Sequence, residues 1–362
     1  MSTALITGFP GFLAKNIIQE LRKQTVFTTI YVLVLPDQLE KAKEMIQEIY
    51  RDGFLNQRIV IVEGDITIRN AGIEVELFEQ LRNEVEYVWH LAAIYDLAVP
   101  QEVAWKVNVL GTGMFNDFVL QFPQIKRYLY FSTAYVAGKR EGNLLETELI
   151  KPNGFKNHYE ETKYEAEVLV EKLKEKIPVT IIRPGIVAGH SQTGETVKFD
   201  GPYFLMNMIS NLRKLPFLPY LGKSHAFINI VPSDYVTKAS IYCSFSDDAV
   251  GKTVHLTDPK PYPVEEVYRA MVKEITGKYP KGRIPLSIAK ASISIYPIRK
   301  KLQVEQETLD YLRWNASFDT TVAEKILFKA DITCPNFLDG IPAMIRFYNE
   351  HKRNQAFHIT IK

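Results

Sequence analysis

The chain has 362 residues, 46% of them hydrophobic and 24% charged, and its 44 Lys and Arg nearly balance its 42 Asp and Glu. A net charge of +2 is unlike the strongly basic balance of nucleic-acid-binding proteins, so we expect no nucleic-acid partner. Two distant cysteines, Cys243 and Cys334, indicate a reducing compartment, and the first residues, MSTALITG, lack the features of a signal peptide. Since no apolar stretch is long enough to span a bilayer, we expect a soluble cytoplasmic protein with no membrane span.

Strand-like and helix-like segments alternate through the first 190 residues. The apolar runs predict six strands, at residues 3–7, 29–35, 58–66, 85–93, 125–133 and 178–189. Amphipathic or apolar segments between them predict helices at residues 14–24, 39–53, 107–122 and 159–176. Nearly continuous Val, Ile and Leu in the strands is typical of a parallel sheet covered on both faces. We therefore predict an α/β fold with a doubly wound parallel (Rossmann) sheet.

The pattern changes after about residue 190. Residues 202–222 are apolar and rich in Pro and aromatics, whereas residues 227–243 and 253–258 again resemble sheet elements. Helical patterns dominate from residue 264 onward and end with residues 338–354. We expect residues 1–190 with about 225–258 to form the sheet domain. Residues of about 191–224 and 259–362 then form a smaller, interleaved, mostly helical part.

The first strand ends in a glycine-containing turn, TGFPGFLA, before the first helix. Gly8 allows a tight turn, Gly11 allows a phosphate to approach the backbone, and Ala14 provides the small residue needed where helix packs on strand. A plain strand–helix turn is the rival interpretation, but the parallel-sheet pattern behind it favours a dinucleotide site. The residues expected to bind the cofactor here are Thr7, Gly8, Phe9, Pro10, Gly11, Phe12 and Leu13, and the sheet domain becomes the NAD(P)-binding domain.

Two further strand ends complete the predicted dinucleotide site. Asp65 and Ile66 end the third strand, where the Asp65 carboxylate suits a hydrogen bond to the adenine amine. Ala92 and Ala93 end the fourth strand, and their small side chains leave room for adenine and ribose. His90 is more simply a core histidine with a satisfied ring than a ligand.

A Ser-Thr pair and a Tyr-x-x-x-Lys segment suggest catalysis of proton transfer. Ser132 and Thr133 end the fifth strand, and Tyr159 and Lys163 lie four residues apart on one face of a predicted helix. A phenol has a pKa near 10, and a nearby ammonium would lower that pKa and ease proton exchange at neutral pH. A chance Tyr-x-x-x-Lys on an ordinary helix is the alternative, but its position between the strand ending in Ser132 and the segment RPG argues against chance.

With these motifs in place, the sequence resembles the extended short-chain dehydrogenase/reductases over nearly its whole length. Within them it is most similar to the branch of fatty acyl-CoA reductases and the thioester-reductase domains of carboxylic acid reductases and peptide synthetases. The resemblance lies in TGFPGFLAK, IYVLVLP, HLAA, NVLGT, FSTAYVAG, YEETKYEAE, IIRPGIVAG, INIVPSDYV and FDTTVAEKIL.

The resemblance implies a role for each matched residue. Tyr159 would be the general acid/base, and Lys163 would lower its pKa and bind the nicotinamide ribose. Thr133 would hydrogen-bond the reacting carbonyl with Ser132 beside it, and Asn108 would support the proton relay. The residues that would lie near the nicotinamide are Pro184, Gly185, Ile186 and Val187.

The end of the second strand departs from the family pattern. Many relatives carry an arginine there that pairs with the 2′-phosphate of NADP, whereas this chain has Leu35. Asp37 suits the free ribose of NAD, and Lys41 and Lys43 could reach a phosphate. The cofactor is therefore NADP(H) or NAD(H), with the preference open.

The leading functional hypothesis is NAD(P)H-dependent reduction of a carbonyl (acyl thioester, aldehyde or ketone) on a largely hydrophobic substrate, by hydride transfer with Tyr159 as general acid. A sugar-nucleotide epimerase or dehydratase, a hydroxysteroid dehydrogenase and a non-catalytic dinucleotide sensor are the alternatives. No metal site is expected, since the histidines lack a metal-ligand spacing. The expected partner is a small molecule, hydrophobic or bound to coenzyme A or a carrier, and a homodimer is left open.

The aromatic and aliphatic residues after RPGIVAG suggest where such a substrate binds. We expect residues 203–221, with part of the C-terminal helices, to wall an apolar channel over the nicotinamide. The alternative is that this segment packs in the core of its own domain. Its apolar side chains are Tyr203, Phe204, Leu205, Met206, Leu215, Phe217, Leu218 and Tyr220.

Overall fold

The computed structural model describes residues 2–361 apart from residues 25, 52, 54–57 and 97–98. Its centre is a seven-stranded sheet in the order β12-β7-β5-β4-β1-β2-β3, and every neighbouring pair is parallel. The strands are β1 (Ser2–Thr7), β2 (Phe27–Val34), β3 (Arg58–Glu63), β4 (Tyr87–His90), β5 (Arg127–Phe131), β7 (Val179–Pro184) and β12 (Thr253–Leu256). The predicted doubly wound fold is confirmed, and the strand order reverses between β1 and β4, where such folds bind ligands.

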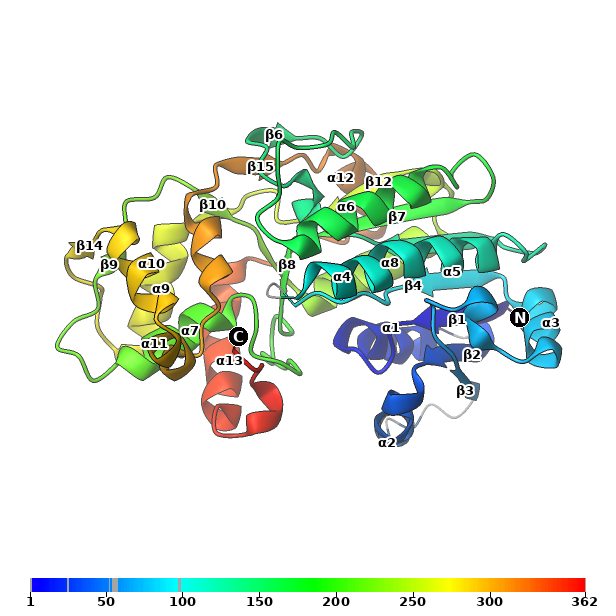
Figure 1. Ribbon diagram of the computed structural model, residues 1–362, viewed down its shortest axis with the longest axis horizontal. Coiled ribbons are helices and arrows are strands. Elements are labelled where there is room, and N and C mark those ends of the chain that lie inside the picture. Colours follow the sequence, from blue (N-terminus) through cyan, green and yellow to red (C-terminus); the bar gives the residue numbers. More distant parts are fainter. Residues whose placement is uncertain (1, 25, 52, 54–57, 97–98, 362) are drawn as a thin grey trace.

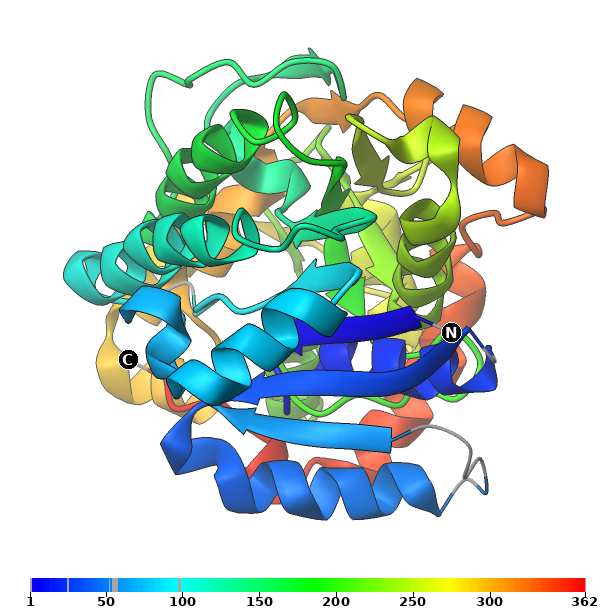
Figure 2. The ribbon, with the colours of Figure 1, turned by 90° about the vertical axis from the view of Figure 1, so that its right-hand side faces the viewer.

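Helices cover both faces of the sheet (Figure 2). Because side chains alternate along a strand, Ala4 and Ile6 pack on one face of β1 while Leu5 packs on the other. The first face is covered by α1 (Phe12–Lys23), α2 (Leu39–Tyr50), α8 (Ser233–Phe245) and α12 (Thr321–Leu327). The second face is covered by α3 (Val75–Glu84), α5 (Thr112–Val119) and α6 (His158–Glu171).

A second hydrophobic core lies at the other end of the molecule, to the left in Figure 1. It is built from helices α7 (Tyr203–Leu212), α9 (Val264–Thr276), α10 (Leu286–Ser294) and α13 (Phe337–His351), with α11 (Tyr296–Leu302) beside them. The remaining short helix α4 (Gln101–Ala104) leads into a π-helical turn, Trp105–Gly111. Most elements of the C-terminal half therefore pack in this second core and not on the sheet. The exceptions are α8, α12 and β12, which belong to the sheet part.

Four two-stranded ribbons lie outside the central sheet, and each pairs segments distant in sequence. They are β6 (Gly142–Leu144) with β15 (Ala316–Phe318), β8 (Ile186–Ala188) with β11 (Ile230–Pro232), β9 (Tyr220–Leu221) with β14 (Arg283–Ile284), and β10 (Phe227–Ile228) with β13 (Tyr262–Pro263). Among the described helices, none has both the length and the apolar character needed to cross a membrane.

The expectation of sheet elements over residues 227–243 is wrong for most of that range. Only 227–228 and 230–232 are strands, and residues 233–245 form helix α8. This helix contacts strands β5 and β7 as well as helices α1 and α12, so residues on most of its sides are buried. A helix buried nearly all round shows no amphipathic period, which explains the misassignment. Helix α3, at residues 75–84, was also missed.

Candidate active site

The turn after β1 has the backbone conformation that a dinucleotide pyrophosphate needs. Gly8 has φ of +82°, and a Cβ there would lie 2.9 Å from the backbone nitrogen of Ala92. A Cβ on Gly11 would lie 2.5 Å from the Gly8 carbonyl oxygen, so both positions require glycine. None of the described side chains caps the N-terminus of α1, and its first turn contains no acidic residue. The free N–H groups and positive helix end therefore fit a pyrophosphate.

Thr7 joins this turn to the end of β4. Its hydroxyl oxygen accepts hydrogen bonds from the backbone nitrogens of Leu91 (3.1 Å) and Ala92 (3.0 Å), so its proton is donated to Nδ1 of His90 (2.8 Å). Nε2 of His90 is then protonated and donates to Oγ1 of Thr112 at 3.3 Å. Burial lowers the pKa of His90 well below its usual value, and the Lys163 charge adds to this effect. His90 is a neutral core histidine, as the simpler interpretation expected.

The predicted adenine-side residues lie at neighbouring strand ends. Oδ1 of Asp65 accepts a hydrogen bond from the backbone nitrogen of Thr67 at 2.8 Å, which holds the turn after β3. Ile66 is buried and packs against Gly111, where a Cβ would lie 3.0 Å from its side chain. Ala92 and Ala93 are half-buried in the segment after β4. The structure thus brings these residues to one edge of the sheet, and adenine binding by them stays a prediction.

Asn108 lies in the π-helical turn and is fully engaged with the protein. Its Oδ1 accepts from the backbone nitrogen of Ile94 (2.8 Å), and its Nδ2 donates to the carbonyl of Ile94 (2.9 Å) and to Oγ1 of Thr162 (3.0 Å). These bonds tie the segment after β4 to helix α6, which carries Tyr159. The structure thus shows that Asn108 positions these two segments. Its role in a proton relay stays a prediction.

Tyr159 and Thr133 meet at the carboxyl end of β5. Tyr159 is in the first turn of α6, where Asn157 caps the helix by accepting from the backbone nitrogen of Glu160 at 2.9 Å. The side chains of Tyr159 and Thr133 are hydrogen-bonded. Burial raises the pKa of Tyr159 well above 10, while the bond to Thr133 acts in the opposite direction. Tyr159 is therefore protonated at neutral pH.

Lys163 lies one turn further along α6 and is buried. Its Nζ donates to the carbonyl of Phe131 (2.6 Å) and to the hydroxyl of Tyr130 (2.9 Å). Burial lowers the pKa of Lys163 to about 7, and the Glu167 charge opposes that shift. The expected lowering of the Tyr159 pKa is not found in this arrangement, because burial of the phenol dominates and the ammonium is bonded to Tyr130 and Phe131.

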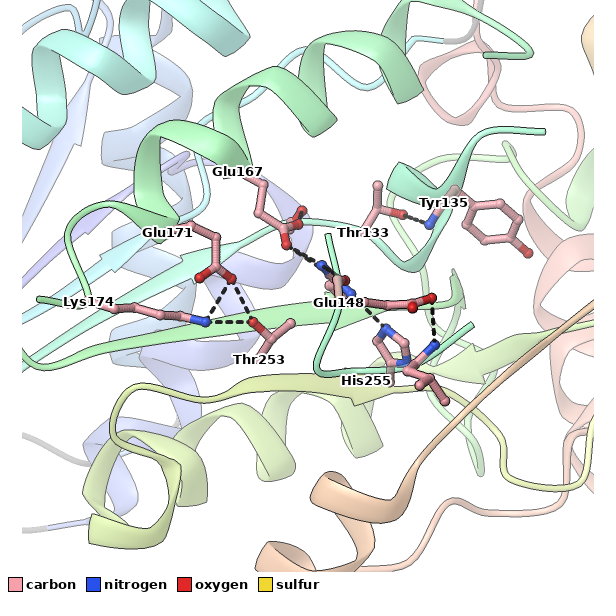
Figure 3. Close-up of polar contacts among 11 residues, drawn as sticks. Thr133, Tyr135, Glu148, Glu167, Glu171, Lys174, Thr253 and His255 are labelled. Atoms are coloured by element: carbon pink, nitrogen blue, oxygen red, sulfur yellow. Dashed lines mark hydrogen bonds and ion pairs between the residues drawn. The ribbon is translucent and has the colours of Figure 1, made fainter. Parts of the chain in front are cut away.

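Sequence reasoning missed a buried ion pair next to these residues (Figure 3). Arg183 donates through Nε (2.9 Å) and Nη2 (2.5 Å) to Oε1 of Glu167, and the Ser132 hydroxyl donates to the other oxygen of Glu167. Arg183 also donates to the Glu148 carbonyl (3.0 Å) and to Nε2 of His255 (3.2 Å). Because Glu167 follows Lys163 by four residues, it lies on the same face of α6. That spacing was the available sequence signal.

The pair connects three predicted site segments. Glu167 is on the helix of Tyr159, Ser132 immediately precedes Thr133, and Arg183 immediately precedes Pro184. Because the Ser132 hydroxyl is bonded to Glu167, its side chain is directed toward the buried pair. The ion pair therefore fixes the relative positions of the strand ends of β5 and β7 and of helix α6.

The segment after β7 has its own close approach. A Cβ on Gly185 would lie 2.8 Å from Oδ1 of Asn229, which itself accepts from the backbone nitrogen of Asp258 at 2.8 Å. Ile186 and Val187 follow in β8 and are half-buried. Pro184, Gly185, Ile186 and Val187 thus lie beside the end of β5, and their contact with a nicotinamide stays a prediction.

Leu35 lies directly after β2 and is 44% exposed, so a longer side chain would fit there. Asp37 and Lys41 are also exposed, whereas Lys43 forms an ion pair with Glu40 at 2.7 Å. These positions are compatible with both the 2′-phosphate of NADP(H) and the free ribose of NAD(H). The cofactor preference therefore stays open, as in the sequence prediction.

Most of the apolar segment 203–221 packs in the C-terminal core, and a channel over the nicotinamide stays a prediction. Phe204 is only 2% exposed and packs with α9 and α13 in the C-terminal core, as do Tyr203, Leu205, Met206 and Leu218. Leu215 and Phe217 are exposed. The alternative interpretation, packing in its own core, therefore describes most of this segment.

Comparison with known proteins decides the family. The sequence model of the family described as male sterility protein, an NAD-binding domain, matches residues 6–240. The chain belongs to this family. The predicted membership of the extended short-chain dehydrogenase/reductases and the NAD(P)-binding domain are thereby confirmed.

The curated relatives that this chain matches are larger than it is. Fatty acyl-CoA reductase 1 of Arabidopsis thaliana is 24% identical over 305 residues, which cover 66% of this chain and 62% of the relative. The non-canonical nonribosomal peptide synthetase cpsA of Aspergillus campestris is 27% identical over 270 residues, 69% of this chain but 25% of the synthetase. This chain thus spans less than two thirds of these relatives.

Solved structures of similar fold cover nearly the whole chain. The terminal R domain from the myxalamid PKS-NRPS biosynthetic pathway has a TM-score of 0.82 at 25% identity, covering 98% of this chain and 92% of that one. UDP-glucuronic acid 4-epimerase from Bacillus cereus, in complex with NAD, has a TM-score of 0.67 at 16% identity and covers 97% and 98%. The likeness to the epimerase is one of fold alone.

Proposed function

We propose that this male sterility family member reduces an acyl thioester or aldehyde with NAD(P)H, and that the acyl part of the substrate is hydrophobic. The observation that carries the proposal is the hydrogen-bonded pair of Thr133 and protonated Tyr159 at the carboxyl end of β5, two strands from β1 and its glycine turn. Two hydroxyls at one point can hold the same carbonyl oxygen. The named activities of the fatty acyl-CoA reductase relatives support the choice of substrate class.

The residues present fit a dinucleotide, with the turn from Thr7 to Leu13 holding the pyrophosphate and Lys163 the nicotinamide ribose. Residues 1–190 and about 225–258 would bind this cofactor, and about 191–224 with 259–362 would bind the substrate. When bound, the cofactor supplies the hydride.

The protein supplies the proton and the orientation. Tyr159 would donate its phenolic proton to the substrate oxygen as negative charge develops there, and Thr133 would hold that oxygen by a second hydrogen bond. Tyr159 is protonated at neutral pH, so its phenol carries the proton that it would donate, and the hydrogen bond to Thr133 opposes the rise in pKa that burial causes. For a thioester, collapse of the resulting hemithioacetal would release an aldehyde and the thiol of coenzyme A or a carrier.

A substrate-class screen tests this proposal. NAD(P)H oxidation is followed with acyl-CoAs of increasing length and free aldehydes, NAD(P)+ reduction with hydroxysteroids, and product formation by chromatography with nucleotide sugars. We expect turnover with acyl-CoAs or aldehydes, and an affinity for them that rises with chain length, since each buried methylene contributes about 0.8 kcal/mol. Turnover of nucleotide sugars alone would refute the proposal and favour an epimerase or dehydratase.

A further inference from the structure

Helices α10 and α11 lie at the end of the molecule farthest from the sheet, to the left in Figure 1, and large apolar side chains are exposed there. Helix α10 buries Leu286, Ala289 and Ile293 in the C-terminal core. Its opposite side exposes Ile288. Ile295, which directly follows the helix, is 53% exposed. The adjoining helix α11 buries none of its residues, and Tyr296 and Ile298 are exposed.

A second exposed apolar segment lies beside these helices. The loop after α7 exposes Leu215 and Phe217, the latter by 51%. This loop is held close to α10 and α11, because α7 contacts α11 and the backbone nitrogen of Lys281 donates to the carbonyl of Leu218 at 2.9 Å. Tyr279, two residues before Lys281, is also exposed. We call the exposed side chains of residues 213–217, 278–281 and 287–301 the basic end.

The charge of the basic end has one sign. Residues 278–301 contain seven Lys and Arg and no Asp or Glu, in a chain whose net charge is only +2. Arg283 pairs with Glu265, and Lys290 pairs with Asp310. Within the part of the chain that the structure describes, Lys278, Lys281, Lys300 and Lys301 form no ion pair. Arg213 and Lys214 add two exposed cations beside Leu215.

From this juxtaposition we propose that the basic end binds an anionic lipid surface. Isoleucine and phenylalanine side chains would enter the headgroup and acyl boundary, while the lysines around them attract anionic headgroups. A second copy of this chain fits poorly, because a symmetric contact would place these lysines against each other. An acidic carrier protein would satisfy the lysines but leave the protruding isoleucines and Phe217 without an apolar partner.

Co-sedimentation of the full chain with lipid vesicles tests the proposal without any substrate, so its outcome is independent of the proposed reaction. The vesicles contain phosphatidylcholine alone or phosphatidylcholine with phosphatidylglycerol. We expect binding to the anionic vesicles that weakens as salt is added, and far weaker binding to phosphatidylcholine alone.

Paired variants distinguish vesicle binding through the basic end from nonspecific binding by other exposed residues. Lys300→Glu with Lys301→Glu should lower the partition coefficient about 25-fold or more. The matched charge control is Lys172→Glu with Lys176→Glu, two exposed lysines on the sheet part, which should leave vesicle binding unchanged. Unchanged thermal unfolding and NAD(P)H binding would show that each variant is folded.

The apolar contribution has its own pair. Ile295→Ser should reduce binding to anionic vesicles several-fold, whereas Phe328→Ser, at a residue 86% exposed on the sheet part, should not. The proposal is overturned if the wild-type chain ignores anionic vesicles, or if both members of a pair lose binding equally. Binding of an acidic carrier protein through Lys300 and Lys301, without vesicle binding, would also overturn it.

Discussion

Replacing Glu167 with Gln removes one charge from the buried ion pair while keeping the size of the side chain. Glu167 and Arg183 are both buried, and Arg183 directs two N–H groups at one carboxylate oxygen. In Glu167→Gln the guanidinium keeps its bonds to the Glu148 carbonyl and to His255 but loses its only charged partner among the described residues. An uncompensated buried charge should therefore destabilise the fold.

The size of the effect follows from burial. Removing one partner of a buried ion pair costs about 3–5 kcal/mol, and the amide oxygen left facing Arg183 favours the lower end. With an unfolding entropy of about 2.1 cal/mol/K per residue, this corresponds to a fall in Tm of about 4–7 °C for a chain of this length. The Glu167 charge also raises the pKa of Lys163, so that pKa should fall further in the variant.

Thermal and urea unfolding measure the difference against a matched variant on the same helix. Glu171 is 31% exposed and pairs with Lys174, 17% exposed, at 2.7 Å (Figure 3). Because that pair is partly solvated, Glu171→Gln should cost at most about 1 kcal/mol. Equal losses in the two variants would refute the argument that burial makes the Glu167–Arg183 pair important.

Three further predictions concern the cofactor and its surroundings. Gly8→Ala should weaken dinucleotide binding and stability together, because its Cβ would lie 2.9 Å from a backbone nitrogen at φ of +82°; fluorescence titration with NAD(P)H that matches wild type would contradict this. Leu35→Arg should raise the NADPH-to-NADH affinity ratio, since a guanidinium can pair with a 2′-phosphate, and an unchanged ratio would place this strand end away from the ribose. Lys163 has a pKa of about 7 in the folded chain, below its unfolded value, so its charge destabilises the fold below pH 7 and this cost disappears as the pH rises toward 10. Urea unfolding of wild type and Lys163→Met should show the wild type gaining stability relative to the variant across that range, and a constant difference would refute the assignment.

The sheet and its glycine turn could be predicted from the sequence because their signals are local. Runs such as IYVLVL can be buried only in a strand covered on both faces, and Gly8 and Gly11 occur where backbone approach requires them. Helix α8 could not be recognised, because packing against the sheet, α1 and α12 buries residues on most of its sides and removes the helical period.

The sequence was sufficient to predict which residues lie in the candidate site, but not which hydrogen bonds their side chains form. Tyr159 and Thr133 could be paired from their positions on a helix and a strand end, whereas the bonds of Lys163 to Tyr130 and Phe131 depend on side-chain packing. Apolar density around Phe204 could not distinguish a channel wall from a core, because both are lined by the same residue types.

The central claim is that Tyr159 delivers the proton to the oxygen of a reduced acyl thioester or aldehyde. Single-turnover oxidation of NAD(P)H by an acyl-CoA, measured for the wild type and Tyr159→Phe at saturating cofactor, tests it directly. Because the variant keeps the ring and loses only the hydroxyl, cofactor affinity should be unchanged while the rate falls by about 10²–10⁴-fold. A variant that reduces the acyl-CoA at nearly the wild-type rate would contradict the account.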